Sequence, residues 1–513
     1  MAVQSFHQFG FLYQIMWIHF VLIAVFLAIF WLRNRYSYWE KRGVPYIPAS
    51  YPLGNLQGLF GQQLSTLTKG FYEKLKGPAR KLGGIYFFIN PVAIALDLEF
   101  VKDILIKDFR YFHDRGLYYN EKDDPLTAHL LTLEGNKWKT LRNKLTPTFT
   151  SGKMKTMFPL ITSVAEHFQQ SLEAAVATGQ DIEVKDFLAR YTTDVIGTCA
   201  FGLECNSLAD PKAKFREKGR RAVQQSPIQV IKVFFGLTFG DLARRMHLRV
   251  IKKDVSEFFM NAVKQAVEHR EHSKEVRNDF MDLLIKLKNT QPIEGENIKQ
   301  LGPLTLNEIA AQAFVFFVAG FETSSTAMTF CLYELALNEE LQEKARQNVL
   351  DSLESHGSMT YEAIYDMKYI ENCINESLRK YPPITNIFRC VSNNYQVPGS
   401  DIVLEKGFRV MVPVYAIHHD PEYYPKPEMY DPERFNPDQA NQRHHMAFIP
   451  FGDGPRSCIG LRFGMMQARV GMAYLLKNFR FKLASRTCTP LVIDPSSFIM
   501  APKGGLWLQI DKV

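Results

Sequence analysis

The sequence predicts a mainly α-helical protein with small β-sheets, organised as a single large domain behind an N-terminal transmembrane helix. Long amphipathic segments dominate the chain, whereas the strand-like pieces near residues 85–96 and 408–414 are short. No βαβ alternation, internal repeat or low-complexity tract is visible. A chain of 513 residues is long enough for about three domains, but no break in composition supports that division. The amphipathic segments cover residues 154–178, 249–270, 305–338, 338–356, 361–381 and 461–478.

The N-terminal segment is apolar and uncharged as far as Leu32. A helix from Phe11 to Leu32 would be about 33 Å long, which is enough to cross the hydrocarbon core of a membrane. Basic residues follow at positions 33, 35, 41 and 42 against a single acid, Glu40, and the positive-inside rule places this flank in the cytosol. A cleaved secretory signal would need a shorter apolar region, a basic start and a small-residue cleavage site. We therefore expect residues 1–32 to be a signal anchor.

Residues 33–55 combine this basic stop-transfer flank with a proline-rich stretch. Three prolines and a glycine fall between positions 45 and 54, which excludes a helix and predicts a stiff hinge. Residues 56–513 are then expected to form the domain that carries the chemistry.

One further segment, residues 228–240, is strongly apolar, with Lys232 as its only charge. It is too short to span a membrane. Burial in the core and a second, interfacial contact with the membrane explain this composition equally well.

Composition narrows the class of protein. The net charge of +8 fits contact with an anionic membrane surface or an acidic protein. No basic run with interleaved aromatic residues and no nucleic-acid motif is visible, so we expect no nucleic-acid partner. The seven cysteines are odd in number, widely spaced and form no CxxC pair. This pattern argues against a disulfide framework or a zinc site and favours a reducing compartment.

The run FGDGPRSCIG at residues 451–460 comes directly before an amphipathic helix at 461–478. Its first two glycines allow a tight loop, and Cys458 falls at the helix N-terminus, where free N–H groups and the helix dipole favour a thiolate. Gly460 leaves no side chain beyond the cysteine, and Arg456 adds a positive charge two residues before it. An inert buried cysteine, the fate of most cysteines, would not need this pattern. The run therefore favours a thiolate that binds a metal.

The same run does not match a phosphate-binding loop. The spacing Gly452-x-Gly454 lacks the later glycine of a dinucleotide fingerprint, and no GK[ST] loop follows a strand elsewhere. The sequence therefore shows no nicotinamide or flavin site, and electrons for redox chemistry must come from another protein.

The run at residues 451–460 resembles the haem-thiolate signature of the cytochrome P-450 family, in which phenylalanine, glycine, arginine, cysteine and glycine recur at this spacing. Three further motifs occur in the order of that family, so the resemblance covers essentially everything after residue 55. The stretches 448–456 and 461–465 are similar to the insect microsomal group called family six. The resemblance implies that haem b is the cofactor, with Cys458 as the axial ligand of its iron and Phe451 beside it.

The long apolar segment 305–338 contains a weak point at residues 319–324. Glycine and hydroxyl residues are poor helix formers, and the Thr323 hydroxyl can bond the carbonyl one turn back. A packing kink would produce the same local sequence. The resemblance implies instead a groove over the haem, lined by Ala319, in which Thr323 relays protons to bound oxygen and Glu322 is its acid partner.

The resemblance also implies two groups of supporting charges. A dianionic cofactor in a dry pocket must have its charge paired, although each arginine taken alone would usually be a solvated surface charge. The residues that correspond to propionate partners are Trp138, Arg142, Arg115, Arg389 and Arg456. A second group is expected to support the cysteine loop and to take no part in chemistry. It consists of Glu376, Arg379 three residues later, and Arg434 of the run PERF.

The activity implied is insertion of one oxygen atom from O2 into lipophilic small molecules, including insecticides, plant toxins and hormones. Electrons would come from an NADPH–cytochrome reductase on the cytosolic side of the endoplasmic reticulum membrane, with cytochrome b5 as a further candidate donor. Substrate contacts would fall on residues 109–130, on the helix around Phe317, on 387–388 and on 498–499. The basic residues that could dock an acidic reductase are Lys137, Lys139, Arg142, Lys144, Arg443, Arg462 and Lys477.

Two other classes of function remain open at this point. A haem-thiolate isomerase or dehydratase would need no reductase, and a haem protein that only binds a ligand would not be an enzyme. The Glu322–Thr323 pair argues for the oxygenase, because neither alternative needs a proton relay over the iron.

Overall fold

The computed structural model describes residues 2–224, 226–273, 277, 279–289 and 303–513, and the fold is mainly helical with small sheets, as predicted. The helices are α1 (Ala2–Tyr36), α2 (Leu64–Leu75), α3 (Leu98–Lys102), α4 (Gly135–Leu145), α5 (Ser151–Val176), α6 (Val184–Ile196), α7 (Lys214–Val223), α8 (Pro227–Thr238), α9 (Gly240–Arg245), α10 (Lys253–Ser273), α11 (Phe280–Asn289), α12 (Leu306–Leu337), α13 (Glu339–His356), α14 (Tyr361–Asp366), α15 (Lys368–Lys380), α16 (Val414–His418), α17 (Pro437–Ala440) and α18 (Leu461–Asn478).

The strands form three small sheets. They are β1 (Leu82–Phe87), β2 (Asn90–Ala95), β3 (Ile182–Glu183), β4 (Ile387–Cys390), β5 (Tyr395–Gln396), β6 (Val403–Leu404), β7 (Arg409–Val412), β8 (Phe479–Leu483) and β9 (Trp507–Lys512). The largest sheet has the order β1-β2-β7-β4 and is antiparallel except for the β2–β7 pair. The other two have the orders β3-β9-β8 and β5-β6.

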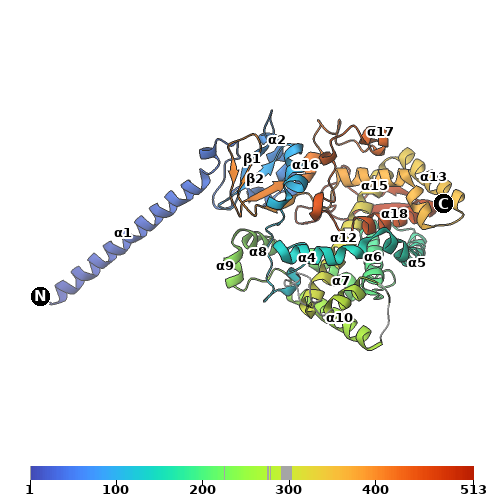
Figure 1. Ribbon diagram of the computed structural model, residues 1–513, viewed down its shortest axis with the longest axis horizontal. Helices are drawn as coiled ribbons and strands as arrows, with labels where there is room; N and C mark the ends of the chain where they lie inside the picture. The colour runs from blue at the N-terminus through green and yellow to red at the C-terminus, as the bar shows by residue number, and fades with distance from the viewer. Residues whose placement is uncertain (1, 225, 274–276, 278, 290–302) are drawn as a thin grey trace, which may run out of the picture.

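Two hydrophobic cores make up the globular part. The larger core is formed by the helices, and the smaller one surrounds the four-stranded sheet. The cysteine loop lies between them, because Ile449 belongs to the sheet core while Phe451 and Ile459 pack against the helical core. Figure 1 shows the sheet beside the end of α1 and most of the helices on its far side.

Helix α12 runs through the middle of the helical part (Figure 1). A capping box begins it, in which Thr305 and Glu308 each bond the other's backbone N–H. The helix then packs against α6, α15 and α18. It is long and apolar enough to cross a membrane, but 67% of its most apolar window is buried inside the protein. We therefore assign it to the core.

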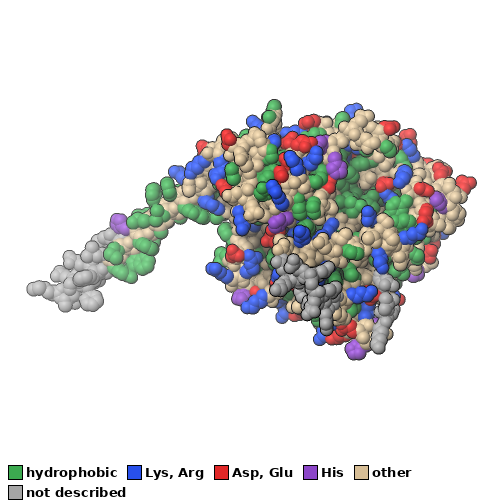
Figure 2. Space-filling view, in the orientation of Figure 1, with side chains coloured by type: hydrophobic (Ala, Val, Ile, Leu, Met, Phe, Trp, Pro, Cys, Tyr) green, Lys and Arg blue, Asp and Glu red, His purple; other side chains and the backbone are tan. Residues whose placement is uncertain are grey.

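Helix α1 has the opposite environment. It projects away from the globule (Figure 1), and none of the most apolar window from Met16 onward is buried. Phe20, Phe26 and Phe30 are all more than 60% exposed, and Figure 2 shows apolar side chains along this helix. Such a surface is stable only when another apolar phase covers it, so the helix fits a membrane anchor.

The segment that follows α1, where the sequence predicts a stiff hinge within residues 33–55, begins with contacts to the sheet. Trp39 is fully buried and donates its indole N–H to the Ile85 carbonyl, 3.1 Å away. Its ring occupies the space beside Gly84, where a Cβ would lie only 2.4 Å from the ring. Tyr36 also bonds the Phe88 carbonyl at 2.9 Å. The segment is thus held on β1 by packing and is not a free connection.

The apolar segment 228–240 forms α8 and the turn into α9. Ile228 is 68% exposed and Ile231 is 50% exposed, so the first half of α8 is not buried core. Its other end is fixed to the sheet, because Asn90 donates to the Thr238 carbonyl at 3.3 Å. The same Asn90 amide accepts a bond from Arg35 at the end of α1, at 3.0 Å. One side chain therefore bridges the end of the anchor helix and the end of α8.

Deleting residues 1–32 should leave this globule intact, because Tyr36 and Trp39 keep their contacts with β1. We expect the truncated chain to retain a native cofactor absorption spectrum and to associate more weakly with membranes. Sedimentation with microsomes and a visible spectrum measure the two properties. If the truncated chain lost its cofactor, the anchor would have to be part of the fold.

Candidate active site

The cysteine loop is a tight turn fixed from both sides. Gly454 has φ +70°, and a Cβ there would lie 1.9 Å from the Leu105 carbonyl oxygen, so only glycine fits. The Cys458 N–H donates to the Phe451 carbonyl at 2.9 Å and closes the loop. Helix α18 begins three residues after the cysteine. A Cβ on Gly460 would meet no protein atom within 4 Å, so packing within the chain does not require that glycine.

The Cys458 sulfur is accessible although protein surrounds it on most sides. Burial raises the pKa of its thiol, while the Gly460 N–H and the charges of Arg142 and Arg115 act to lower that pKa. The loop thus provides an N–H donor, and Arg142 of α4 and Arg115 provide two cations, which are the groups that stabilise a thiolate. The accessible sulfur can accept a further ligand.

Helix α12 exposes one narrow face in the middle of its buried length. Ala319 is exposed and Thr323, one turn later, is half-buried. The Thr323 hydroxyl donates to the Ala319 carbonyl at 2.6 Å, which is the bond that its place in the sequence suggests. Two neighbouring helices bond the carbonyls of this turn, since Gln467 of α18 donates to Gly320 and Thr192 of α6 donates to Phe321, both at 2.8 Å.

Glu322 lies in this turn but does not face Thr323. Its side chain is 8% exposed and forms an ion pair with Lys185 of α6, with the Nζ and Oε1 atoms 2.5 Å apart. Among the hydrogen bonds of the described residues, none joins the Glu322 carboxylate to the Thr323 hydroxyl. The structure therefore places the acid and the alcohol in one turn of helix but on different sides of it.

Three arginines converge beside the cysteine loop. Arg389 of β4 and Arg456 are buried and Arg115 is half-buried, and each has an Nε–H without a partner among the described residues. Burial, followed by mutual repulsion, lowers the pKa of Arg456 to about 9 and that of Arg389 well below its usual value. Asp114 is the nearest acid, at 3.8 Å from Arg456. The cluster thus carries more positive charge than its neighbours offset.

Glu376, Arg379 and Arg434 form a second buried cluster. Arg379 bonds both carboxylate oxygens of Glu376, at 2.7 and 2.8 Å, and the Arg434 Nε lies 3.5 Å from Oε1. His418 links this cluster to the cysteine loop. It accepts a bond from the Ile449 N–H at 3.0 Å, while its carbonyl accepts one from Arg379 at 3.1 Å. Burial and the Arg379 charge lower the pKa of His418 to about 3, so the ring is neutral.

Comparison with known proteins identifies the family. The model of the family described as cytochrome P-450 matches residues 52–508. The chain belongs to the cytochrome P-450 family. Similar proteins include probable cytochrome P-450 6a14 of Drosophila melanogaster, which is 43% identical over 93% of this chain and 96% of its own length. Cytochrome P-450 6A1 of Musca domestica is 43% identical over 95% and 96%, and probable cytochrome P-450 6a18 of D. melanogaster is 45% identical over 98% and 100%.

These findings confirm the resemblance to the insect family-six group. The chain is a P-450 monooxygenase, an oxidoreductase whose family cofactor is haem with a thiolate ligand. The residues present fit that cofactor. Its two propionates would offset the excess charge of Arg115, Arg389 and Arg456, and the accessible Cys458 sulfur would take the axial position.

The other residues expected around the haem lie close to Cys458 and the arginine cluster. Trp138 of α4 is buried, with the Arg456 guanidinium stacked 4.2 Å above its ring. Arg142, one turn later on α4, is near enough to Cys458 to affect its pKa. Phe451 is half-buried, and its carbonyl closes the loop by accepting the bond from the Cys458 N–H. The P-450 signature thus corresponds to one compact constellation around the cysteine.

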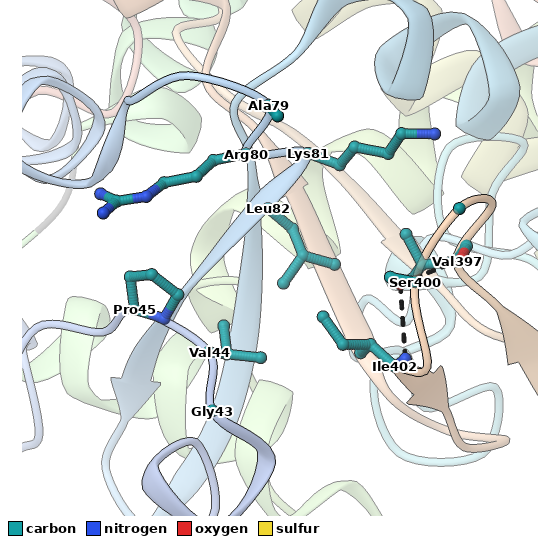
Figure 3. A pocket seen from close by; sticks show the side chains of 11 residues that line it. Gly43, Val44, Pro45, Ala79, Arg80, Lys81, Leu82, Val397, Ser400 and Ile402 are labelled. Atoms are coloured by element: carbon teal, nitrogen blue, oxygen red, sulfur yellow. Dashed lines mark hydrogen bonds between the residues drawn. The ribbon is translucent and has the colours of Figure 1, made fainter.

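Phe317 lies elsewhere than its expected place near the substrate. It is 1% exposed and packs against Phe259 and Phe321 in the helical core, so we assign no substrate contact to it. A pocket of about 180 Å³ (Figure 3) is also separate from the active site, because Gly43, Leu82 and Ile402 line it rather than any haem residue. Its volume is also below the range of about 300–1,000 Å³ that is usual for pockets that bind small molecules.

Three site residues had no signal in the sequence. Lys185, His418 and Gln467 act through contacts with residues 31 to 147 positions away in the chain. A lysine at the start of a helix, a buried histidine or a glutamine within a helix has no spacing pattern that would distinguish its role.

Replacing Cys458 by serine should remove the red-shifted Soret band that a thiolate ligand gives to the reduced carbon monoxide complex. Serine keeps the size of the side chain but is a poor ligand for haem iron. The matched control is Cys488→Ser, because Cys488 is exposed and lies outside the loop. An unchanged carbon monoxide spectrum in the Cys458 variant would refute its assignment as the ligand.

Proposed function

We propose that this P-450 oxidises lipophilic small molecules, including insecticides and plant toxins, at the endoplasmic reticulum membrane, with electrons from an NADPH-dependent reductase. The observation that carries this proposal is the accessible face of α12 at Ala319 and Thr323. The turn of α12 that carries this face is bonded to α18, the helix that follows Cys458, because Gln467 donates to the Gly320 carbonyl. An isomerase or a simple ligand-binding protein would have no use for a hydroxyl group at this point.

When bound, haem supplies the redox and oxygen-activating chemistry, and the chain controls water and protons around it. We assign the final proton donor to Thr323 Oγ1. Its hydroxyl carries one hydrogen and two lone pairs, so it can release the Ala319 carbonyl, donate into the accessible face and be reprotonated from a neighbouring group. Glu322 is the proposed acid that supplies protons to this turn from the side of α6.

The residues expected around the substrate support a lipophilic molecule. Phe388 of β4 is half-buried next to Arg389, and its ring lies 6.1 Å from that of Phe87. Phe498 is 53% exposed and Ile499 is buried. These side chains offer apolar surface and few polar groups, which favours ligands that are themselves poorly soluble in water.

A basic surface on α4 and α18 supports docking of an acidic reductase. Lys139 and Arg462 are exposed, and both lie on helices that hold the cysteine loop. Lys137 is partly neutralised by Glu121, 2.9 Å away. The Arg443 guanidinium stacks on the Tyr424 ring, so we assign it to packing within the protein and not to docking. We therefore propose Lys139 and Arg462 as the main docking cations.

A second membrane contact through α8 is the other part of the proposal. The exposed isoleucines of α8 are followed by two more exposed apolar side chains, Leu242 of α9 and Met246 directly after it. They belong to the region that Asn90 joins to the end of α1. Burying such side chains at the headgroup boundary is favourable, and the contact would set the orientation of the domain on the bilayer.

Replacing Ile228 and Ile231 together by asparagine tests this contact. In the chain lacking residues 1–32, the double change should weaken vesicle binding by about tenfold or more, because two large apolar side chains no longer enter the interface. Vesicle flotation measures the binding. The control is Leu160→Asn with Val492→Asn, which removes exposed apolar surface elsewhere. Equal binding by both double variants would rule out a specific role for α8.

Replacing Thr323 by alanine tests the oxygenase proposal. Product formed per NADPH should fall by up to about 100-fold, with hydrogen peroxide released instead, because the last proton donor is missing. The assay combines the full chain, a reductase and a lipophilic probe such as 7-ethoxycoumarin. Thr323→Ser should restore coupling. Thr329→Ala is a matched control, since Thr329 makes the same bond one turn back in the same helix but is fully buried. Product formation without reductase or NADPH would favour an isomerase.

A further inference from the structure

A cluster of charges, partly or fully buried, lies at the start of α6, where this helix packs on α12. Lys185 forms the ion pair with Glu322 at 2.5 Å. Next to it, Asp186 bonds Arg190 at 2.7 Å and Arg216 of α7 at 2.9 Å. None of these residues of α6 and α7 belongs to the haem-binding motifs of the sequence.

We propose that Lys185 is a positioning residue that holds the Glu322 carboxylate at the entrance of the proton path and connects it to solvent. This inference rests on the proposed relay through Glu322 and Thr323. It adds the group that determines where the acid points and from which side protons arrive.

Glu322 needs such a partner because its carboxylate is largely removed from water. A carboxylate that is 8% exposed is costly unless a cation and hydrogen bonds compensate for the lost water. Among the described residues, Lys185 is the only cation within ion-pair distance of Glu322. The carboxylate of Glu322 is therefore directed towards α6 by this single interaction.

Lys185 itself reaches the surface. Its side chain is 17% exposed, compared with 8% for Glu322. An ammonium group carries three N–H donors, so it can hold the carboxylate and a water molecule at once. A water molecule bound there can return a proton to Glu322 after each transfer inward, and the charge of Lys185 stays the same.

The backbone around Lys185 is fixed, which aims the side chain at α12. Glu183 caps α6 by accepting bonds from the N–H groups of Lys185 and Asp186, at 3.3 and 2.7 Å. Leu506 donates to the same carboxylate at 3.0 Å. Further along α6, the bond from Thr192 to the Phe321 carbonyl sets the register of the two helices. The position of the ammonium group is thus fixed by contacts of α6, of α12 and of the segment at Leu506.

Helix α7 covers this ion pair. Arg216 is 8% exposed, and its guanidinium lies 5.9 Å from the centre of the Phe321 ring. Its Nε and Nη1 atoms are buried and have no partner among the described residues. Donors of this kind are usually satisfied by ordered water, so they fit a wet path beside Lys185 and Glu322.

The test is coupling of NADPH oxidation to product in the full chain with reductase, with 7-ethoxycoumarin as the probe. Lys185→Met should lower product per NADPH by about tenfold and raise the solvent deuterium isotope effect, with an unchanged carbon monoxide spectrum. Lys185→Arg should restore most of the coupling. If Lys185→Met fails to bind haem, Lys185→Gln, which keeps a hydrogen-bond donor, takes its place with the same expected result.

Helix α12 provides a matched control. Its Glu334 forms a second lysine–glutamate pair, with Lys380 at the end of α15; the two groups are 2.8 Å apart, and their side chains are 6% and 13% exposed. Lys380→Met should leave coupling and the isotope effect unchanged. An equal loss of coupling in this variant would overturn the proposal, because the effect would then come from breaking any buried pair on α12.

A double-mutant cycle separates the role of Lys185 from general stability. In a Glu322→Gln background, adding Lys185→Met should cause no further loss, because the two residues act as one unit. An additional loss there, or native coupling in Lys185→Met, would overturn the inference. The proposed relay fails by a different result, namely full coupling in Thr323→Ala, so the two failures can be told apart.

Discussion

The haem-thiolate chemistry of the P-450 family needs a cysteine sulfur that stays accessible inside a folded protein, and the fold offers one at Cys458. The Gly454 turn presses against the Leu105 carbonyl so closely that a methyl group would not fit. This contact and the bond from the Cys458 N–H to the Phe451 carbonyl fix the loop that carries the accessible cysteine. The Glu376–Arg379–Arg434 cluster then supports the loop through His418. A neutral His418 can accept the bond from Ile449, which a protonated ring could not.

The structure keeps two groups of contacts apart. On the sheet side, Asn90 connects the end of α1 with the end of α8. On the helical side, Lys185 of α6 pairs with Glu322 of α12. The cysteine loop lies between the two cores.

Local patterns in the sequence predicted the parts of the fold that depend on neighbouring residues. The cysteine loop, the helix that follows it at Leu461–Asn478, and the pairing of Glu376 with Arg379 all arise from spacings of a few positions. The central helix was expected at 305–338 and spans Leu306–Leu337, because its cap is encoded at Thr305.

Features that depend on distant residues could not be predicted in this way. Glu322 was expected as the acid partner of Thr323, but its ion pair with Lys185 could not be foreseen, because the two residues are 137 positions apart in the chain. The prolines predict a stiff hinge after α1, but no local pattern indicates that Trp39 packs on the sheet, where Gly84 leaves room for its ring. Composition also left open whether residues 228–240 are core, and only the packing of α8 shows which side chains remain exposed.

The unbalanced arginines have a consequence for how much folded enzyme a cell can hold. Arg115, Arg389 and Arg456 repel one another until an anionic partner arrives, so the native state gains stability from cofactor loading. Saturation at one hundred times the dissociation constant adds about 2.7 kcal/mol to the stability of any folded protein. A difference of that size changes the population open to proteases by about a hundredfold. Cofactor loading is therefore expected to protect the folded chain from degradation.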